Sequence, residues 1–252
     1  MKVVVCVKQI PDPATPYSLE EGTNLLVRPD EQVLDDTDRY GVEMGLQLAQ
    51  ANEGTVTLMS MGPKGNAQGI RQALAMGADK AVIIEDEALR GSDALTTARV
   101  LAKAIGNEGF DLVIAGTEST DGYSGVIPQM LAELLDVPAL TYATSVETDG
   151  SEVTIHRQTV DGYDVVKADL PAVVSVTAGV VEPRYPTFKG IMDAKKKPVE
   201  TVGLSDLGVD PGGTQKVASI TDAPEREAGR KVEDEGEAFA EIVALLEQKK
   251  VI

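Results

Sequence analysis

The sequence predicts an α/β protein built on a doubly wound, mainly parallel sheet. Short β-branched runs alternate with helical patterns through the first half of the 252-residue chain. Four such runs, mostly apolar as in strands buried on both faces, lie at residues 2–7, 55–61, 80–85 and 111–115. Ala and Leu recur at helical spacing at residues 38–51, 66–76 and 92–105, and Ser92 with Asp93 offers a helix cap. We therefore expect right-handed crossovers and a ligand beyond the carboxyl ends of the strands.

The pattern changes after Pro138, where strand-like runs follow one another closely. These runs lie at residues 140–147, 152–158, 163–168 and 172–176. The dipeptides Asp149-Gly150 and Asp161-Gly162 are typical of tight turns between antiparallel strands. This part of the chain therefore predicts antiparallel hairpins added to the parallel sheet.

The last quarter of the chain predicts an arm that ends in a helix. Residues 206–229 are polar and rich in Gly and Pro, with little periodicity. Residues 236–249 return to helical spacing, with apolar positions such as Phe239 and Leu246 on one side. We expect one domain over residues 1–200 and an extended arm over residues 201–252, whose amphipathic helix needs a surface to lie on.

Charge and cysteine content exclude several classes of protein. The chain has 23 Lys and Arg against 41 Asp and Glu, a net charge of −18, which repels nucleic acid and anionic membranes. The acidic residues are scattered, as on a solvated surface. The single cysteine, Cys6, cannot form a disulfide within the chain, so we expect a cytoplasmic protein. No apolar run reaches the length needed to insert into a membrane.

A loop rich in small residues offers the most informative candidate site. Residues 115–125 follow a buried strand and lead into a helical pattern at 126–135. Glycines at such a turn permit close backbone approach, and free amides at a helix start attract phosphate. Asp121 would either accept hydrogen bonds from sugar hydroxyls or tie down the loop. The alternative is an ordinary turn, because the loop matches neither common phosphate-binding fingerprint.

Other reactive side chains give weak signals. Cys6 lies in an apolar strand, which favours an inert buried thiol. His156 is the only histidine, and its place in a strand favours an exposed or hydrogen-bonded role over a general base. Carboxylate pairs such as Asp35 and Asp36 are common in acidic chains, so we predict no metal site and no catalytic residue. The proline-bounded loop at 182–192 is either a core plug or an exposed anchor.

Four stretches of the chain together resemble the beta subunit of electron transfer flavoproteins. They are Val5-Cys6-Val7-Lys8, the run Arg-Gln-Ala-Leu-Ala-Met-Gly-Ala-Asp at 71–79, residues 116–130, and Glu-Pro-Arg-Tyr at 182–185 followed by Ile-Met-Asp-Ala-Lys-Lys-Lys at 191–197. The resemblance covers nearly the whole chain. It implies a non-catalytic electron carrier, a heterodimer in which an alpha subunit holds most of an FAD.

The resemblance also implies that residues 1–200 bind a nucleotide. In most members this is AMP, and in electron-bifurcating, NADH-dependent members a second FAD takes its place. Gly125, Val126 and Ile127 stand where relatives usually have Asn-Gln-Thr, which leaves backbone groups and Ser124 for the phosphate. The implied cofactor contacts are Cys6, Asp35, Asp36, Thr37, Asp38, Met61, Ser119, Thr120, Asp121, Gly122, Tyr123, Ser124, Gly125, Val126, Ile127 and Gln129.

The same resemblance implies a partner recognition loop at 182–197 that docks on acyl-CoA or other dehydrogenases in fatty acid oxidation. Its implied contacts are Tyr185, Thr187, Phe188, Ile191 and Met192. Electrons would pass to a quinone oxidoreductase or another acceptor, and the arm over residues 201–252 would wrap the alpha subunit. The competing interpretation is a stand-alone adenine-nucleotide-binding regulatory module. A hydrolytic enzyme is a weaker alternative, because no nucleophile and base stand out.

Overall fold

The structure is a computed structural model that describes residues 1–62, 65, 67–221, 223–224, 229, 231–234 and 236–252. The chain divides into two compact units, Met1–Val217 and Ala218–Ile252. Strand β11 (Val199–Val202) spans the expected boundary after residue 200, so the first unit continues past it. The expected helix start at residue 66 and parts of the arm fall outside the described residues.

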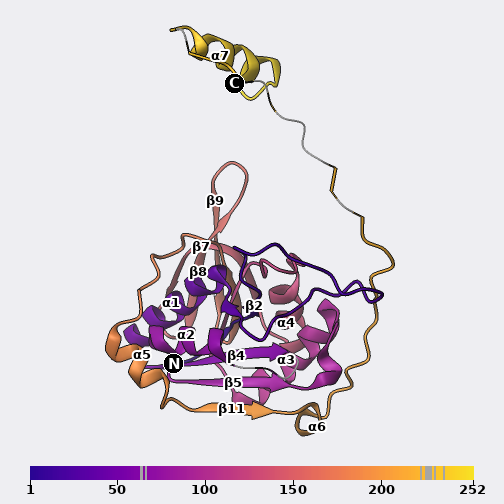
Figure 1. Ribbon diagram of the computed structural model, residues 1–252. Coiled ribbons are helices and arrows are strands. Elements are labelled where there is room, and N and C mark those ends of the chain that lie inside the picture. Colours follow the sequence, from indigo (N-terminus) through magenta and orange to yellow (C-terminus); the bar gives the residue numbers. More distant parts are fainter. Residues whose placement is uncertain (63–64, 66, 222, 225–228, 230, 235) are drawn as a thin grey trace. The chain divides into compact units, whose positions relative to one another are not determined.

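A nine-stranded sheet forms the centre of the first unit (Figure 1). The strands are β1 (Lys2–Cys6), β4 (Thr55–Gly62), β5 (Lys80–Glu85), β6 (Leu112–Gly116), β7 (Ala139–Thr148), β8 (Glu152–Gln158), β9 (Tyr163–Asp169), β10 (Ala172–Val176) and β11. Their order is β11-β5-β4-β1-β6-β10-β7-β8-β9. All pairs from β11 to β7 are parallel, and β8 and β9 add an antiparallel hairpin. This arrangement confirms the predicted fold class.

One of the predicted hairpin strands was wrong. Strand β10 does not pair with β9 but lies between β6 and β7, parallel to both. The physical reason is its composition: all five residues of Ala-Val-Val-Ser-Val are buried, and an outer hairpin would expose one face of them. Its one polar side chain, Ser175, accepts a hydrogen bond from the Tyr142 amide at 3.0 Å. The proximity of β10 to the hairpins in sequence hid its place in the sheet centre.

Helices cover both faces of the sheet. They are α1 (Asp36–Ala51), α2 (Gln68–Met76), α3 (Ala94–Glu108), α4 (Ile127–Leu135), α5 (Phe188–Ala194) and α6 (Leu204–Leu207), with a 3₁₀ turn η1 (Glu87–Leu89) before α3. Each central strand contributes side chains to two hydrophobic cores, one on each side of the sheet, because successive side chains point to opposite faces. In β1, Val3 and Val5 join the core beneath α1 and α2, whereas Val4 joins the core beneath α3 and α4.

The beginning of the predicted arm packs onto the first unit. Leu204 and Leu207 of α6 are buried beside α3, so residues just after 200 belong to a core. Further on, the Asp93 carboxylate accepts hydrogen bonds from the Thr214 and Gln215 amides at 2.6 and 2.9 Å. The same side chain caps α3 through Thr96.

The second unit contains the predicted terminal helix, α7 (Ala238–Gln248). Most of its large apolar side chains are exposed, with Phe239 at 68% and Ile242 at 57%. In the described part of the chain, no helix is long and apolar enough to cross a membrane.

Candidate functional site

A cavity of about 560 Å³ lies at the carboxyl ends of the parallel strands. The chain runs from β1 to β4 and β5 on one side, and then places β6 on the other side of β1. The cavity opens at this reversal, the position where doubly wound sheets bind ligands. Its walls include Cys6 of β1, Met61 of β4, Gly116 of β6 and Ile127 of α4. The location agrees with the expectation from the sequence.

The loop between β6 and α4 presents backbone to this cavity. Gly125 has a left-handed φ of +63°, and a Cβ there would lie 3.2 Å from Glu118 Oε2. A Cβ on Gly122 would lie 3.2 Å from Ser119 Oγ. Helix α4 begins at Ile127, and no side chain accepts a hydrogen bond from the backbone amides at its start. These amides and the partial positive charge of the helix start suit an anionic group.

A buried carboxylate, Asp121, fixes the loop from below. Its side chain is fully buried and forms ion pairs with Lys8 Nζ at 2.6 Å and with Arg28. Burial raises the pKa of Asp121, but the two cations outweigh burial and hold this pKa below its usual value. Asp121 therefore ties down the loop, which is one of the two roles that the sequence left open.

A second carboxylate, Asp35, joins the loop to the start of α1. It is the N-cap of α1 and accepts bonds from the Thr37 amide and hydroxyl at 3.1 and 2.8 Å. Its other oxygen accepts bonds from the Thr120 amide and hydroxyl at 2.7 and 3.0 Å. With four donors around it, fully buried Asp35 acts as a structural brace.

Asp38 and Cys6 lie together at the floor of the cavity. Burial, reinforced by the Asp35 charge, raises the pKa of Asp38 well above its usual value. One Asp38 oxygen accepts the Lys8 amide at 2.6 Å. Burial and the nearby Asp38 raise the pKa of the Cys6 thiol to about 12, so the thiol stays protonated at neutral pH. Neither group is set up as a nucleophile.

The predicted cofactor residues divide into two groups. Those that line the cavity are Cys6, Asp38, Met61, Ser119, Gly122, Ser124, Gly125 and Ile127. Those that the structure places behind or beside the lining are Asp35, Asp36, Thr37, Thr120, Asp121, Tyr123, Val126 and Gln129. Asp36 points into solvent, where it pairs with Arg39 at 2.9 Å, and Tyr123 is 67% exposed.

Sequence reasoning missed one whole wall of the cavity. Residues 11–32, here called the strap, join β2 (Gln9–Ile10) to β3 (Val33–Leu34) and contribute Leu25, Arg28 and Asp30 to the lining. The turn η1 and the residues after it contribute Leu89, Arg90 and Ser92. The sequence contains a signal for this wall. The long segment between the first strand and the first helix starts at the carboxyl end of that strand, which is the ligand-binding edge of a doubly wound sheet.

The cavity fits a nucleotide by size and by its polar groups. Its volume lies within the range of about 300–1,000 Å³ that is usual for small-molecule and cofactor sites. Gln129 Oε1 in α4 is buried and has no hydrogen-bond partner among the described residues, but Gln129 does not line the cavity. The lining cations Lys8, Arg28 and Arg90 are paired with carboxylates. A bound phosphate would therefore depend mainly on the backbone amides of the loop.

The loop at 182–197 forms a separate surface feature. Tyr185 is 87% exposed and Phe188 is 81% exposed, so this loop is an anchor-like surface and not a core plug. Arg184 holds the loop to α1 through Glu43, with Nε to Oε2 at 2.6 Å and a second guanidinium nitrogen to Oε1 at 2.9 Å. Burial raises the pKa of Glu43, but its bonds to Arg184 outweigh burial and lower it.

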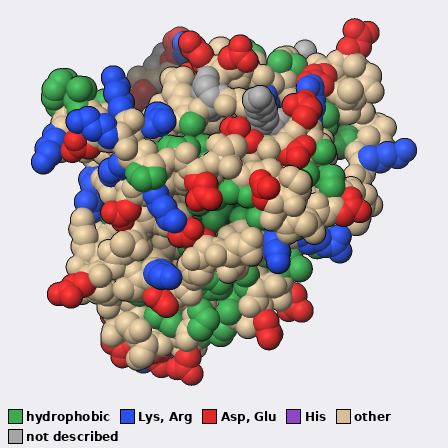
Figure 2. Space-filling model, turned by 90° about the horizontal axis from the view of Figure 1, so that it is seen from below, with side chains coloured by type: hydrophobic (Ala, Val, Ile, Leu, Met, Phe, Trp, Pro, Cys, Tyr) green, Lys and Arg blue, Asp and Glu red, His purple; other side chains and the backbone are tan. Residues whose placement is uncertain are grey.

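The carboxyl ends of α2 and α5 are held together by Arg71 in α2 and by Lys197, which follows α5. Lys197 Nζ donates to the Leu74 and Ala78 carbonyls at 3.0 and 2.6 Å, and Arg71 donates to the Ala194 carbonyl at 2.9 Å. Two of the family-like stretches, 71–79 and 191–197, therefore pack as one unit. Figure 2 shows the surface seen from below Figure 1. On this surface many Lys and Arg side chains gather at the left, the side of α5 in Figure 1, whereas Asp and Glu are spread across it.

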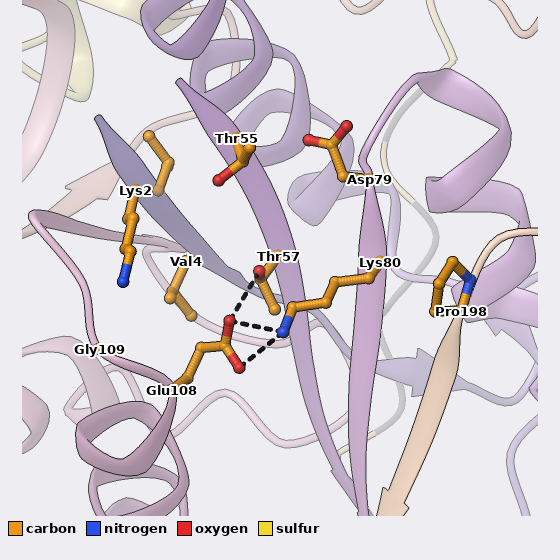
Figure 3. Close-up of a pocket in the computed structure, with 10 residues that line it drawn as sticks. Lys2, Val4, Thr55, Thr57, Asp79, Lys80, Glu108, Gly109 and Pro198 are labelled. Carbon is orange, nitrogen blue, oxygen red and sulfur yellow. Dashed lines mark hydrogen bonds and ion pairs between the residues drawn. The ribbon is translucent and has the colours of Figure 1, made fainter. Parts of the chain in front are cut away.

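A smaller cavity of about 400 Å³ lies at the amino ends of β1, β4 and β5 (Figure 3). Lys80 Nζ lies 2.7 Å from Glu108 Oε1, and the same carboxylate accepts the Thr57 hydroxyl at 3.3 Å. This cluster ties the end of α3 to two strands. Of the stretches that carry the family resemblance, its described lining contains one residue, Asp79 at the end of 71–79.

Two further features considered from the sequence are His156 and the possible metal ligands. His156 stacks on Tyr163 in the β8–β9 hairpin, with ring centroids 4.1 Å apart and planes 12° apart. Among the described residues, no group of three or more His, Cys, Asp or Glu side chains is arranged to hold a metal ion.

The fold and its main cavity define a doubly wound α/β protein with a cofactor-sized site at the switch point of the sheet. A family model described as electron transfer flavoprotein domain matches residues 23–207. The chain is 42% identical to the electron transfer flavoprotein subunit beta of Mycobacterium bovis over 99% of both chains. It is 33% identical to the subunit of the same name from Thermoanaerobacterium thermosaccharolyticum over 100% of both. It is also 33% identical to the caffeyl-CoA reductase-Etf complex subunit CarD of Acetobacterium woodii, over 88% of this chain and 85% of that one.

The chain belongs to the electron transfer flavoprotein family as a beta subunit. By the family's name its members carry electrons, and a beta subunit implies an alpha-subunit partner. The family resemblance stated from the sequence is confirmed.

Proposed function

We propose that this chain binds AMP in the main cavity and completes the FAD site of an alpha subunit, as one half of a soluble electron-carrying heterodimer. The pair takes electrons from dehydrogenases, including those for acyl-CoA, and passes them to a quinone oxidoreductase or another acceptor. The chain supplies binding and positioning groups, and the flavin supplies the redox chemistry.

The observation that carries the nucleotide assignment is the cavity over the uncapped start of α4. The phosphate would lie against the amides of Ser124 to Ile127, where the glycines leave room and the helix dipole favours negative charge. The adenosine part would extend toward Cys6, Asp38 and Met61 along the strand ends. Asp35 and Asp121 keep the loop in place without touching the ligand.

The docking surface for dehydrogenases in this proposal is the loop at 182–197. Tyr185, Phe188, Ile191 and Met192 are exposed apolar side chains, and lysines such as Lys189 lie beside them in an otherwise acidic chain. Such a surface suits a partner with an apolar pocket and an acidic rim. Thr187 caps α5 and fixes the direction of these side chains through the Gly190 amide at 3.0 Å.

The test is the cofactor content of the chain purified with its alpha subunit. Flavin is measured by absorbance, and released nucleotides are separated by chromatography. One FAD and one AMP per heterodimer is the expected result. A complex without flavin would contradict the electron-carrier assignment.

The same measurement decides between two other functions. Two FAD molecules per heterodimer, together with reduction by NADH, would assign the main cavity to a second flavin and make the complex electron-bifurcating. Similarity to a subunit named for a caffeyl-CoA reductase-Etf complex gives this alternative a concrete precedent. A stable monomer that holds nucleotide and never flavin would instead indicate the regulatory module.

A further inference from the structure

The strap over residues 11–32 has backbone pairing at its two ends and at its tip. Its two ends are joined by the antiparallel pair of β2 and β3, in which Gln9 faces Leu34 and Ile10 faces Val33. Its tip is a small hairpin, closed by the bridge between Leu19 and Leu26. A segment with paired ends and a paired tip can swing about its neck without losing its own hydrogen bonds.

The strap forms a wall of the main cavity but buries little of itself. The strap residues that line the cavity are Glu20, Leu25, Leu26, Arg28, Pro29, Asp30 and Gln32. None of its described large apolar side chains is fully buried: Tyr17 is 41% exposed, Leu19 48% and Val27 40%, and Leu25 and Leu26 are half-buried. Apolar burial therefore holds the strap less firmly than the fully buried side chains of the two cores hold the sheet.

Among the described residues, two ion pairs connect the strap to the rest of the unit. Arg28 pairs with Asp121 in the loop before α4, and Glu20 pairs with Arg90 after η1. Between them, Leu25 packs against Gly91, where an added Cβ would lie 3.2 Å from Leu25 Cδ2. Both ion pairs bridge parts of the chain that are far apart in sequence.

The Arg28 connection can open at moderate cost. The Asp121 side chain is fully buried, so its charge would be uncompensated if Arg28 were the one cation beside it. Lys8 Nζ, 2.6 Å from the other Asp121 oxygen, Oδ1, would still balance this charge if the Arg28 contact opened. The shared carboxylate therefore makes this contact a reversible latch.

We propose that the strap is a lid over the nucleotide cavity, latched by Arg28–Asp121 and Glu20–Arg90, and that its opening limits nucleotide release. This proposal rests on the nucleotide site proposed above. Asp121 belongs to the loop that receives the phosphate, so a nucleotide that orders this loop also strengthens the Arg28 latch. By reciprocity, a closed lid strengthens nucleotide binding.

The sharpest test compares two glutamates that share one arginine. Glu20 on the strap and Glu87 on η1 both pair with Arg90, and both line the cavity. Each change to Gln removes one negative charge, which by electrostatics alone would slow the release of an anion.

The alpha–beta complex is loaded with radiolabelled AMP, and release is followed after a chase with unlabelled AMP. We expect Glu20→Gln to release AMP about tenfold faster than the wild type, on the scale of one lost charged hydrogen bond, and Glu87→Gln to stay within about twofold.

The second latch gives an independent readout. Arg28→Ala should speed the exchange of backbone amide hydrogens over residues 18–27 and AMP release together, and Arg28→Lys should restore part of both. AMP release from Glu20→Gln that is as slow as from the wild type would overturn the lid. A wild-type complex that holds no AMP would overturn the nucleotide site and the lid with it. AMP held equally long by wild type and both latch variants would overturn the lid alone.

Discussion

Individual side chains show how this acidic chain tolerates buried charge. Glu43 is 3% exposed, and Arg184 meets both of its oxygens. Asp121 has two cations, and Asp35 has four hydrogen-bond donors. Asp38 has neither kind of compensation in full, and burial accordingly raises its pKa. These differences give two predictions at the residue scale.

Loss of Arg184 should destabilise the first unit strongly. Arg184→Ala leaves the Glu43 carboxylate buried without its partner, so we expect a loss of about 3 kcal/mol in the free energy of unfolding. Urea unfolding followed by circular dichroism measures this loss. The matched control is Arg39→Ala, which removes an exposed pair with Asp36 and should cost less than about 1 kcal/mol. Equal effects of the two changes would show that the Glu43 pair contributes no more than a surface pair.

Asp38 should make stability depend on pH in the direction opposite to Glu43. Its pKa is raised in the folded state, so its contribution is fully present below the unfolded value of about 3.9 and is lost as pH rises toward the folded value. Asp38→Asn removes this penalty. The variant should match the wild type near pH 4 and exceed its unfolding free energy increasingly toward pH 8. A constant difference across this range would show that Asp38 has no raised pKa.

At the scale of elements, the contact between α2 and α5 depends on one glycine. A Cβ at Gly190 would lie 2.5 Å from the Ala75 carbonyl oxygen, and neither backbone can yield easily. Because α5 carries Phe188 and Met192, this contact also sets where the proposed docking side chains lie. The close approach therefore joins the stretch at 71–79 to the residue that precedes the stretch at 191–197.

Gly190→Ala should therefore weaken both stability and docking. We expect about 1–3 kcal/mol of lost unfolding free energy, as for overpacked sites, together with slower reduction by a partner dehydrogenase. Gly106→Ala is the matched control, since Gly106 is exposed in α3 and its added Cβ would meet no atom within 4 Å. This control should gain up to about 1 kcal/mol from helix propensity. A stable Gly190→Ala protein with unchanged electron transfer would contradict the α2–α5 account.

At the scale of the whole molecule, the two units should have separable roles. The first unit holds both cores, the main cavity and the loop at 182–197, whereas α7 in the second unit has exposed apolar residues. Truncation after Val217 should leave the unfolding midpoint of the first unit nearly unchanged. If α7 binds the alpha subunit, the same truncation should weaken heterodimer formation at least about tenfold, measured by titration calorimetry. Unchanged heterodimer affinity would show that the arm does not hold the alpha subunit.

Much of this molecule was readable from local patterns in the sequence. Apolar β-branched runs and helical spacing determined the parallel strands and the helices between them, because burial on one or two faces imposes a period on the chain. The glycine-rich turn before α4 determined the place of the candidate phosphate site. Four short motifs were sufficient to identify the family.

Only the tertiary structure decided how distant segments meet. It placed β10 between β6 and β7, laid the strap over the cavity, and joined Lys8 to Asp121 across 113 positions and Arg28 to Asp121 across 93. The physical reason is that periodicity reports which side of an element is buried, but not which partner buries it. Ion pairs between isolated charges leave no period at all, so the latches and the wall of the site emerge only once the chain is folded.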